Sequence, residues 1–302
     1  MKKSCGHLLK SKAVKFRFIF EHIGKFKVEK MCQTLEVTRS GYHNYVKRRI
    51  TQRKVENAIL LKMIKDIWEN SYRLYGSPRI HAELRFQGIK YNRKRIERLM
   101  RKNGIAAKTK RKYKVTTDSY HKKVIAENLL GQKFSVAEPN RVWASDITYI
   151  GTKEGWLYLA VIMDLYSRMI VGWAMSERIN KELVLRALNQ AIIRRNPAEG
   201  LIFHSDRGSQ YCSDEVVSTL SAKDIAQSMS GKDNCYDNAV VESFFHTLKT
   251  ELVNFQCYKT RSEARFNIFE YIEVFYNKIR RHSSINYLSP VYFENKINSL
   301  VA

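Results

Sequence analysis

The sequence predicts an α/β domain that is preceded by a strongly basic, all-α region. The first observation is charge, because the whole excess of Lys and Arg lies in residues 1–135. The second is periodicity, because apolar residues recur at helical spacing through residue 104 and at strand spacing after Pro139. The third is the order of the later segments, three strands, a helix, a strand and more helix, which is typical of a sheet covered by helices.

Composition limits the class of protein. The chain has 302 residues, 44% of them hydrophobic, a length that predicts about two domains with real cores. No segment approaches the ~20 apolar residues that a membrane span needs, and residues 1–20 lack an uninterrupted apolar stretch, so we expect a cytoplasmic protein with no membrane partner. The cysteines never form a CxxC pair, so we expect neither a disulfide framework nor a zinc site. They are Cys5, Cys32, Cys212, Cys235 and Cys257.

The charge indicates a partner. Residues 1–135 contain 35 Lys and Arg against 10 Asp and Glu, whereas residues 136–302 contain 19 of each, so the net charge of +25 belongs to the first part. A basic excess of this kind displaces counterions from phosphates. We therefore expect the first part of the chain to bind nucleic acid.

The basic region predicts two small helical modules. In residues 28–49, apolar positions precede a turn expected at Ser40-Gly41, and aromatic residues follow, which outlines a helix-turn-helix. A second module begins with an amphipathic helix over residues 57–70, breaks at 76–78 and resumes helical spacing over 79–88. Its last helix, in residues 92–104, is expected to start at Asn92 as N-cap and to close at Gly104.

That last helix is expected to contact DNA. Its apolar residues Ile96, Leu99 and Met100 would face a core, and basic residues cover the remaining surface. An ordinary solvated helix is the alternative, but further basic residues follow it directly. The candidate DNA-binding residues are Arg93, Lys94, Arg95, Arg98 and Arg101 in the helix, and Lys110, Arg111 and Lys112 behind it.

The second part of the chain predicts a sheet. Residues 141–150 alternate apolar and polar residues, 151–156 supply a turn, and 157–168 and 169–176 are further strand candidates. A helix over 181–195 and a short strand ending at Asp206 follow. Asp146 therefore lies within the first strand and Asp206 at the end of the fourth.

A helix over residues 240–249 presents a second pair of charged side chains. Glu242 and Lys249 lie on one face, ~10 Å apart along the axis, with His246 between them, which is too far for a salt bridge. The ordinary interpretation is a solvated charged stripe. The apolar side chains that would dock this helix on a core are Val241, Phe244, Phe245 and Leu248.

The three acids have a possible common site. If the first and fourth strands are neighbours, Asp146 and Asp206 lie near one sheet edge, and the helix can bring Glu242 to them. Such a cluster needs cations, and oxygen ligands suit Mg²⁺ or Mn²⁺, of which two about 4 Å apart support phosphoryl transfer. Lys249 would contact DNA phosphates. Chemistry alone leaves three other acids open as members of the site, namely Asp164, Asp214 and Asp237.

The spacing of these residues resembles a known signature. Between Asp206 and Glu242 lie 35 residues, and Lys249 follows seven positions later, as in the D,D-35-E pattern of bacterial insertion-sequence transposases and retroviral integrases. The segments "WASDITYI", "FHSDRGSQY", "SMSGKDNCYDNAVVESFFHTLKTEL" and "YIEVFYNKIRRHSSINYLSPVYFE" together resemble the second-reading-frame transposase of the insertion-sequence-three family. The resemblance runs from about residue 28 to the C-terminus and includes "YGSPRIHAELRFQG" and "NRKRIERLMRKNG".

The resemblance implies a fold and a chemistry. The core would be ribonuclease H-like, a mixed five-stranded sheet with flanking helices, with catalytic and metal-binding carboxylates at Asp146, Asp206 and Glu242 and a basic partner at Lys249. It implies 3′-end cleavage and transesterification with Mg²⁺ or Mn²⁺, two ions per site, and no covalent protein–DNA intermediate. Asn234, Asp237 and Asn238 match family positions to which we assign no role; Asp237 or Asn238 would cap the helix.

The resemblance also implies an organisation and partners. We expect the ligand to be double-stranded DNA, both the terminal repeats and the target. We expect the protein to form a homo-oligomer on DNA and to act with an upstream-frame protein, as a fusion or as a partner. We expect it in the bacterial cytoplasm, and at the nucleoid when it is bound to DNA. We expect five segments: 1–50, a basic helical segment that can form a helix-turn-helix; 51–115, a second helix-turn-helix-like domain; 116–138, a linker; 139–255, the integrase-like core; and 256–302, its helical extension.

Two other functions remain open at this point. A tyrosine-type recombinase is also basic and has two domains, and "RRHSSINY" places Arg281, His282 and Tyr287 near one another. The other alternative is a non-catalytic DNA-binding regulator with a decayed core. The presence of all three acids argues against decay.

Overall fold

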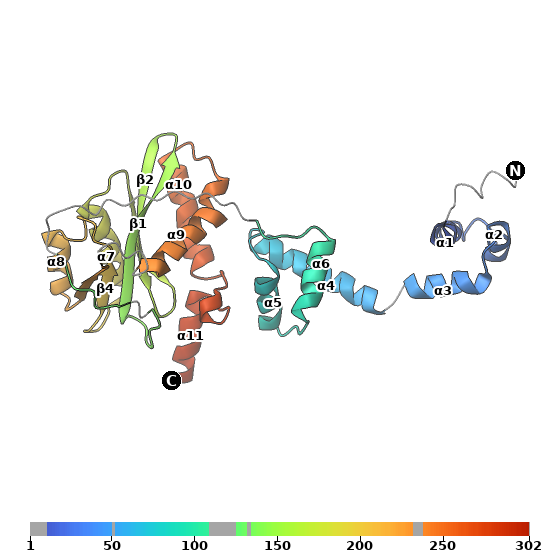
Figure 1. Ribbon diagram of the computed structural model, residues 1–302, viewed down its shortest axis with the longest axis horizontal. Helices are drawn as coiled ribbons and strands as arrows, with labels where there is room; N and C mark the ends of the chain where they lie inside the picture. The colour runs from blue at the N-terminus through green and yellow to red at the C-terminus, as the bar shows by residue number, and fades with distance from the viewer. Residues whose placement is uncertain (1–10, 50–51, 109–124, 132–133, 232–237, 302) are drawn as a thin grey trace. The chain divides into compact units, whose positions relative to one another are not determined.

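A computed structural model describes residues 11–49, 52–108, 125–131, 134–231 and 238–301 of the chain (Figure 1). The contacts divide the chain into two compact units, which are described separately. Unit 1 comprises Met1–Tyr72 and Glu83–Ala106, and unit 2 comprises Arg73–Ala82 and Ala107–Ala302. The domain boundaries expected from the sequence stay predictions. Within the described ranges, no helix is long and apolar enough to cross a membrane.

Three short helices form the first module of unit 1: α1 (Lys12–Glu21), α2 (Val28–Thr34) and α3 (Arg39–Arg49). Their core contains Ile19, Met31, Cys32, Leu35 and Tyr42. The turn expected at Ser40-Gly41 was wrong, because both residues lie inside α3. The chain reverses earlier because the Thr38 hydroxyl accepts a hydrogen bond from the Gly41 N–H at 3.1 Å, which starts the helix there.

The second helical module contains α4 (Gln52–Asn70), α5 (Ser77–Phe86) and α6 (Arg93–Lys102). The expected N-cap is confirmed, because the Asn92 side chain accepts a hydrogen bond from the Lys94 N–H at 2.8 Å. Gly104 follows α6 with a φ of +66°, a conformation that glycine adopts without strain. Ile96, Leu99 and Met100 are buried, as their spacing predicts.

Unit 2 is built on a mixed five-stranded sheet in the order β3-β2-β1-β4-β5, which confirms the predicted fold class. Its strands are β1 (Val142–Thr152), β2 (Gly155–Asp164), β3 (Ile170–Ser176), β4 (Ile202–Ser205) and β5 (Ala226–Met229). The first three are antiparallel neighbours, and β4 and β5 run parallel to β1. The strand expected over residues 157–168 was too long, because the chain turns after Asp164, whose carboxylate accepts the Tyr166 N–H.

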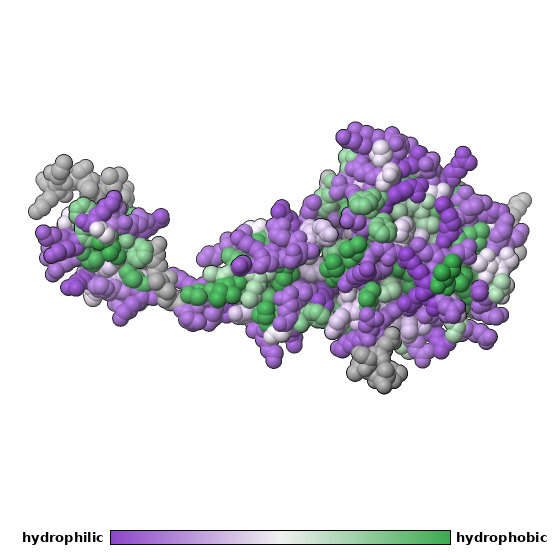
Figure 2. All heavy atoms as spheres, turned by 180° about the vertical axis from the view of Figure 1, so that it is seen from behind, coloured by the Kyte–Doolittle hydropathy of each residue, from purple (hydrophilic) through white to green (hydrophobic). Residues whose placement is uncertain are grey.

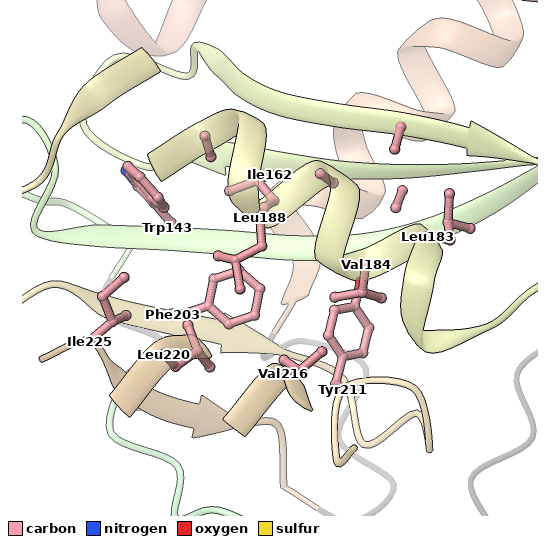
Figure 3. Close-up of a cluster of buried hydrophobic side chains, with 14 of the residues drawn as sticks. Trp143, Ile162, Leu183, Val184, Leu188, Phe203, Tyr211, Val216, Leu220 and Ile225 are labelled. Carbon is pink, nitrogen blue, oxygen red and sulfur yellow. The ribbon is translucent and has the colours of Figure 1, made fainter. Parts of the chain in front are cut away.

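One face of this sheet is covered by α7 (Lys181–Arg195) and α8 (Asp214–Ser221), and α7 has the bounds that its periodicity predicts. Figure 3 shows the rings of Phe203 and Tyr211 pointing toward Leu188 and Val184 of α7. A Cβ atom at Gly172 in β3 would lie 2.3 Å from the Ala187 carbonyl oxygen, so only glycine allows this close approach of helix and strand.

The opposite face carries α9 (Ala239–Glu251) and α10 (Arg261–Phe269), as Figure 1 shows. A π-helical segment, Glu270–Tyr276, continues α10, and α11 (Pro290–Val301) follows at the C-terminal end. On the face seen in Figure 2, hydrophilic side chains cover most of the surface, and hydrophobic ones form small separate patches. The large apolar surfaces of the sheet therefore lie between the helical layers.

Candidate active site

Asp146 and Asp206 lie at the same level of two neighbouring strands. β1 and β4 pair in parallel register up to Ser145 and Ser205, and each aspartate is the next residue. Neighbouring strands are ~4.8 Å apart, so the two aspartates start from adjacent backbones. The expectation that the first and fourth strands would be neighbours is confirmed.

Backbone hydrogen bonds orient both carboxylates. Asp146 Oδ1 accepts the N–H of Ile147 at 2.7 Å, and Asp206 Oδ1 accepts the N–H of Gly208 at 2.9 Å. Gly208 approaches both side chains closely: a Cβ atom at this position would lie 3.0 Å from Asp206 Oδ1 and still closer to the Gln210 side chain. The turn after β4 thus orients the carboxylate of Asp206 through the Gly208 N–H.

The surroundings of Asp146 disfavour its ionised form. Burial raises the pKa of Asp146 well above its usual value, and the charge of Asp206 raises it further. Glu242 adds a smaller effect in the same direction, while the Ile147 N–H and Lys249 act against it. Two such close carboxylates ionise together only when a cation neutralises them.

Helix α9 presents Glu242 to this site. Its buried residues are Val241, Phe244, Phe245 and Leu248, which confirms the predicted apolar face and leaves Glu242 on the exposed one. Partial burial raises the pKa of the Glu242 carboxyl. Among the residues that the structure describes, no three His, Cys, Asp or Glu side chains gather closely enough to hold a metal ion. The charge of Glu242 raises the pKa of Asp146 slightly. Among the described residues, however, the Glu242 carboxylate is too far from the two aspartates for the three to share a metal ion.

The start of α9 is tied to β1 by a residue for which sequence reasoning proposed another role. Asn238 was expected to cap the helix, but its side chain makes no cap hydrogen bond. Its Nδ2 instead donates to the carbonyl oxygen of Ser145 at 3.1 Å, directly before Asp146, and its buried Oδ1 has no partner among the described residues. Asn238 is the N-cap residue of α9, as expected, but this contact holds its side chain against the sheet. Asp237 and Asn234 lie outside the described residues.

Lys249 points back toward the strand that carries Asp146. Its Nζ lies 4.8 Å from the centroid of the Tyr149 ring, a cation–π distance. Burial lowers the pKa of Lys249, while the charges of Tyr149 and Asp146 raise it. This ammonium is thus held beside the carboxylates, and its contact with DNA phosphates stays a prediction.

A buried hydroxyl pair lies behind the aspartates. The Tyr211 hydroxyl and the Ser145 Oγ are 2.9 Å apart, and both side chains are buried. Burial raises the pKa of Tyr211 well above its usual value, and the charges of Asp206 and Asp146 add to this, so the phenol stays protonated. Neither residue was predicted as part of the site, because nothing in their local sequence indicates this contact.

The far end of α9 is anchored by a buried ion cluster that sequence reasoning also missed. Arg280 donates to both carboxylate oxygens of Glu251, at 2.8 and 2.7 Å, Tyr271 donates at 2.8 Å and Arg79 at 3.3 Å. Burial alone would raise the pKa of Glu251, but the hydrogen bonds and charge of Arg280 and the charge of Arg79 lower it overall. The helix that carries Glu242 is therefore fixed at its last residue.

The predicted DNA-binding residues fall into three groups. Arg93, Lys94, Arg98 and Arg101 are exposed on α6. Arg95 is engaged inside unit 1, where it pairs with Glu56 at 3.0 Å and donates to Asn57 at 2.9 Å. The last group, Lys110, Arg111 and Lys112, lies outside the described residues.

The alternative acids have other surroundings. Asp164 is fully buried, accepts the N–H groups of Asn140 and Tyr166, and lies 3.3 Å from Arg195. Burial raises its pKa to about 6, although these partners act against the shift. Asp214 begins α8 on the outside of the core. Neither has a described contact with Asp146 or Asp206.

The residues suggested for a tyrosine recombinase are mostly interior. Arg281 and His282 are buried, and the Arg281 N–H donates to the Tyr75 hydroxyl at 2.9 Å. Burial and the charge of Arg280 lower the pKa of His282 well below its usual value. Tyr287 accepts a hydrogen bond from Arg281 through its backbone carbonyl oxygen at 3.4 Å. This cluster packs the core and does not form an open site.

Comparison with known proteins identifies the class. A sequence profile described as "Integrase core domain" matches residues 136–235, a second profile with this description matches 242–297, and one described as "HTH-like domain" matches 54–113. Together with the mixed sheet, these matches define a DNA-binding polynucleotidyl transferase of the integrase type.

The relatives then identify the family. "Transposase InsF for insertion sequence IS3A" of Escherichia coli K12 is 42% identical over 285 residues, which cover 94% of this chain and 99% of that protein. "Insertion element IS600 uncharacterized 31 kDa protein" of Shigella sonnei is 44% identical, with 90% and 100% covered. The chain belongs to the IS3 family of insertion-sequence transposases, which confirms the resemblance seen in its motifs.

Two solved integrase cores are also similar to this chain. The catalytic core domain of BIV integrase is 19% identical with a TM-score of 0.40, covering 53% of this chain and 99% of that one. The HTLV-2 integrase core in complex with magnesium is 18% identical with a TM-score of 0.41, covering 51% and 96%.

Proposed function

We propose that this transposase cleaves and joins DNA strands through Asp146, Asp206 and Glu242. The observation that carries the proposal is the register of β1 and β4, which brings two aspartates to one level of the sheet. The spacing of 35 residues from Asp206 to Glu242 supports the third member. The reaction would be 3′-end cleavage at the ends of the insertion sequence, followed by strand transfer into target DNA.

The donor set suits a divalent metal ion. The observation that tests the fit is electrostatic: burial raises the pKa of Asp146, and the charge of the neighbouring Asp206 raises it further. Hard carboxylate oxygens prefer Mg²⁺ or Mn²⁺. We propose that Asp146, Asp206 and Glu242 hold two such ions when DNA is bound. Bound ions would activate a water or a 3′-hydroxyl and stabilise the leaving oxygen in phosphoryl transfer.

Glu242 has the position of a ligand that completes the site last. It lies four residues after Asn238, whose side chain fixes the beginning of α9 to β1. Its carboxylate is exposed, whereas those of the two aspartates are oriented by backbone N–H groups. We expect the exposed Glu242 side chain to turn toward the aspartates when DNA and metal bind. Lys249, on the same helix face, would then contact a DNA phosphate.

Unit 1 would supply the binding of DNA. The exposed basic side chains of α6 form a face opposite Ile96, Leu99 and Met100, as expected of a helix that lies along DNA. We propose that this face contacts double-stranded DNA at the terminal repeats, and that Arg95 acts by holding α6 on α4. A homo-oligomer on DNA and an upstream-frame partner belong to the same proposal.

A catalytic test separates this proposal from a non-catalytic regulator. Asp206→Asn should abolish metal-dependent 3′-end cleavage of a labelled duplex that carries an end of the insertion sequence. DNA affinity should stay equal or rise, because the change removes one negative charge near the phosphates. Asp214→Asn, a change of the same kind in the first turn of α8, is the matched control and should cleave normally. Undiminished cleavage by Asp206→Asn would refute the site.

A further inference from the structure

An aromatic pair lies at the end of the β1–β2 hairpin. The Tyr149 and Trp156 rings meet edge to face, with centroids 5.0 Å apart and planes at 85°. The register pairs Gly151 with Trp156 and Tyr149 with Tyr158, so the two rings are diagonal neighbours on one face of the hairpin. Trp156 is 53% exposed, which is a large exposed area for an indole in a catalytic domain.

A cation belongs to the same cluster. Lys249 Nζ lies 4.8 Å from the centroid of the Tyr149 ring, so ammonium, phenol and indole form one continuous group. The lysine comes from α9, the helix that carries Glu242. Tyr149 comes from β1, three residues after Asp146, a distance of about 10 Å along the strand. Lys249 connects the two sites, because its ammonium lies over the Tyr149 ring and also interacts electrostatically with Asp146.

The backbone that carries Trp156 is firmly held. The Trp156 carbonyl oxygen accepts Arg261 Nε at 3.1 Å, and the Arg261 N–H donates to the Glu154 carboxylate at 2.8 Å. In the turn between the strands, the Lys153 N–H donates to the Tyr258 carbonyl oxygen at 3.0 Å. These contacts fix the hairpin through its backbone and through Glu154, so the indole itself is left available to a ligand.

We propose that Trp156, Tyr149 and Lys249 form a platform on which one unpaired base of the cleaved DNA end stacks. An exposed aromatic face beside a cation matches a nucleotide, which has a flat base and a phosphate. The inference rests on the proposed function, because the DNA strand must pass Asp146 to reach the platform. The ~10 Å along β1 from Asp146 to Tyr149 equals the length of about three nucleotides of a stacked strand, so the DNA probes are altered over three positions.

Binding measurements test the platform without any cleavage. The probes are two duplexes with the same sequence from an end of the insertion sequence, one with its last three base pairs mismatched and one fully paired and closed by linkers that carry no bases. Trp156→Ala should weaken binding of the mismatched end by roughly tenfold, because stacking on one aromatic side chain contributes that much. Trp156→Phe should retain most of the affinity, and binding of the closed duplex should change less than about twofold.

Two controls identify the base and the residue. An abasic site about three nucleotides from the cleaved phosphate should weaken wild-type binding as much as Trp156→Ala does, and the two changes together should add nothing further. Phe266→Ala removes another exposed aromatic ring, 61% exposed on α10, and should leave both affinities unchanged. Thermal unfolding checks that each variant is folded.

Three results would overturn the platform. The first is that Trp156→Ala binds both duplexes as the wild type does. The second is that it loses affinity equally for both duplexes. The third is that it loses self-association while its DNA affinity stays the same, which would assign the indole to a protein contact. Because these assays need neither metal nor strand cleavage, their outcome is independent of the Asp206→Asn test. If the binding assays exclude the platform but Asp206→Asn still abolishes metal-dependent cleavage, the proposed function stands without the platform.

Discussion

Two sites with acidic side chains lie along α9, one around Glu251 and one around Asp146, and their electrostatic surroundings are opposite. At Glu251, Arg280 and Arg79 surround the acid, and its pKa is lowered. At Asp146, the nearby groups include Asp206 and Glu242, and its pKa is raised. The first cluster carries its own cations and fixes the helix. At the second cluster, burial and the neighbouring acids favour the protonated form of Asp146, and we propose that a bound cation would reverse this.

This difference separates stability from function within one helix. A buried ion pair that is complete in the folded chain holds structure, whereas buried like charges cost stability until a cation arrives. The two ends of α9 differ in this respect: its last residue, Glu251, is held by the complete ion cluster, and Glu242 near its beginning lies by the aspartates. Changing each cluster should therefore affect a different measurement.

The largest effect on stability is expected at the complete cluster. Glu251→Gln leaves Arg280 buried without its counter-charge, so we expect the free energy of unfolding to fall by about 3–5 kcal/mol. Denaturant unfolding measures it. The matched control is Arg194→Ala, which breaks the more exposed pair of Arg194 with Glu273 and should cost about 1 kcal/mol or less. Equal losses in the two variants would show that the Glu251 cluster does not anchor the helix.

Asp164 is an intermediate case, since it has one arginine partner but remains buried. Its pKa is raised from the usual 3.8 to about 6, so the folded state keeps its proton over a range where the unfolded state has lost it. The contribution of Asp164 is therefore full below pH 4, falls as the pH rises from about 4 to about 6, and is constant above, a loss of about 3 kcal/mol.

The pH dependence is measured by comparing unfolding of the wild type and Asp164→Asn between pH 4 and pH 7. The asparagine variant does not titrate, so the difference between the two curves isolates this carboxyl. We expect the wild type to lose stability relative to the variant as the pH rises. A difference that stays constant, or that changes in the opposite direction, would contradict the raised pKa.

The smallest effect on stability is expected at the hydrogen bond between Asn238, at the start of α9, and Ser145 of β1. Asn238→Ala removes one hydrogen bond to the Ser145 carbonyl oxygen, which should cost about 1 kcal/mol. The cleavage rate should fall more than this loss explains, because Asn238 positions the helix turn that carries Glu242. Thr250→Ala removes a hydrogen bond within the same helix and is the control. A similar loss of rate in both variants would mean that Asn238 has no positioning role.

Local patterns predicted much of the fold. The bounds of α7 follow from its apolar spacing with Asn180 before it and Pro197 behind it, and the Asn92 cap follows from its position before an amphipathic run. β5 has only four residues and gives no alternation that a sequence pattern can distinguish. The turn before α3 was misplaced because a glycine in a sequence can indicate either a turn or a close packing contact. Gly41 makes a close contact, because a Cβ atom there would meet the side chains of Thr38 and Phe16.

Contacts between distant segments explain what was missed at the site. Asn238 meets Ser145 across 93 positions, and Arg79 meets Glu251 across 172. No local property of these residues indicates such partners, so a helix cap was the natural expectation for Asn238. Asp146 and Asp206 were found because the order of strands makes their meeting a consequence of topology. Arg95 counted as one of several basic residues until its pairing with Glu56 appeared.

The most direct test of the central claim is DNA cleavage by Glu242→Gln. The transposase is incubated with labelled insertion-sequence ends and Mg²⁺ or Mn²⁺, beside Ser243→Ala, a change of the exposed neighbouring residue. We expect wild type and Ser243→Ala to release the 3′ end and Glu242→Gln to bind the DNA without cutting it. Cleavage by Glu242→Gln at the wild-type rate would show that α9 contributes no catalytic carboxylate.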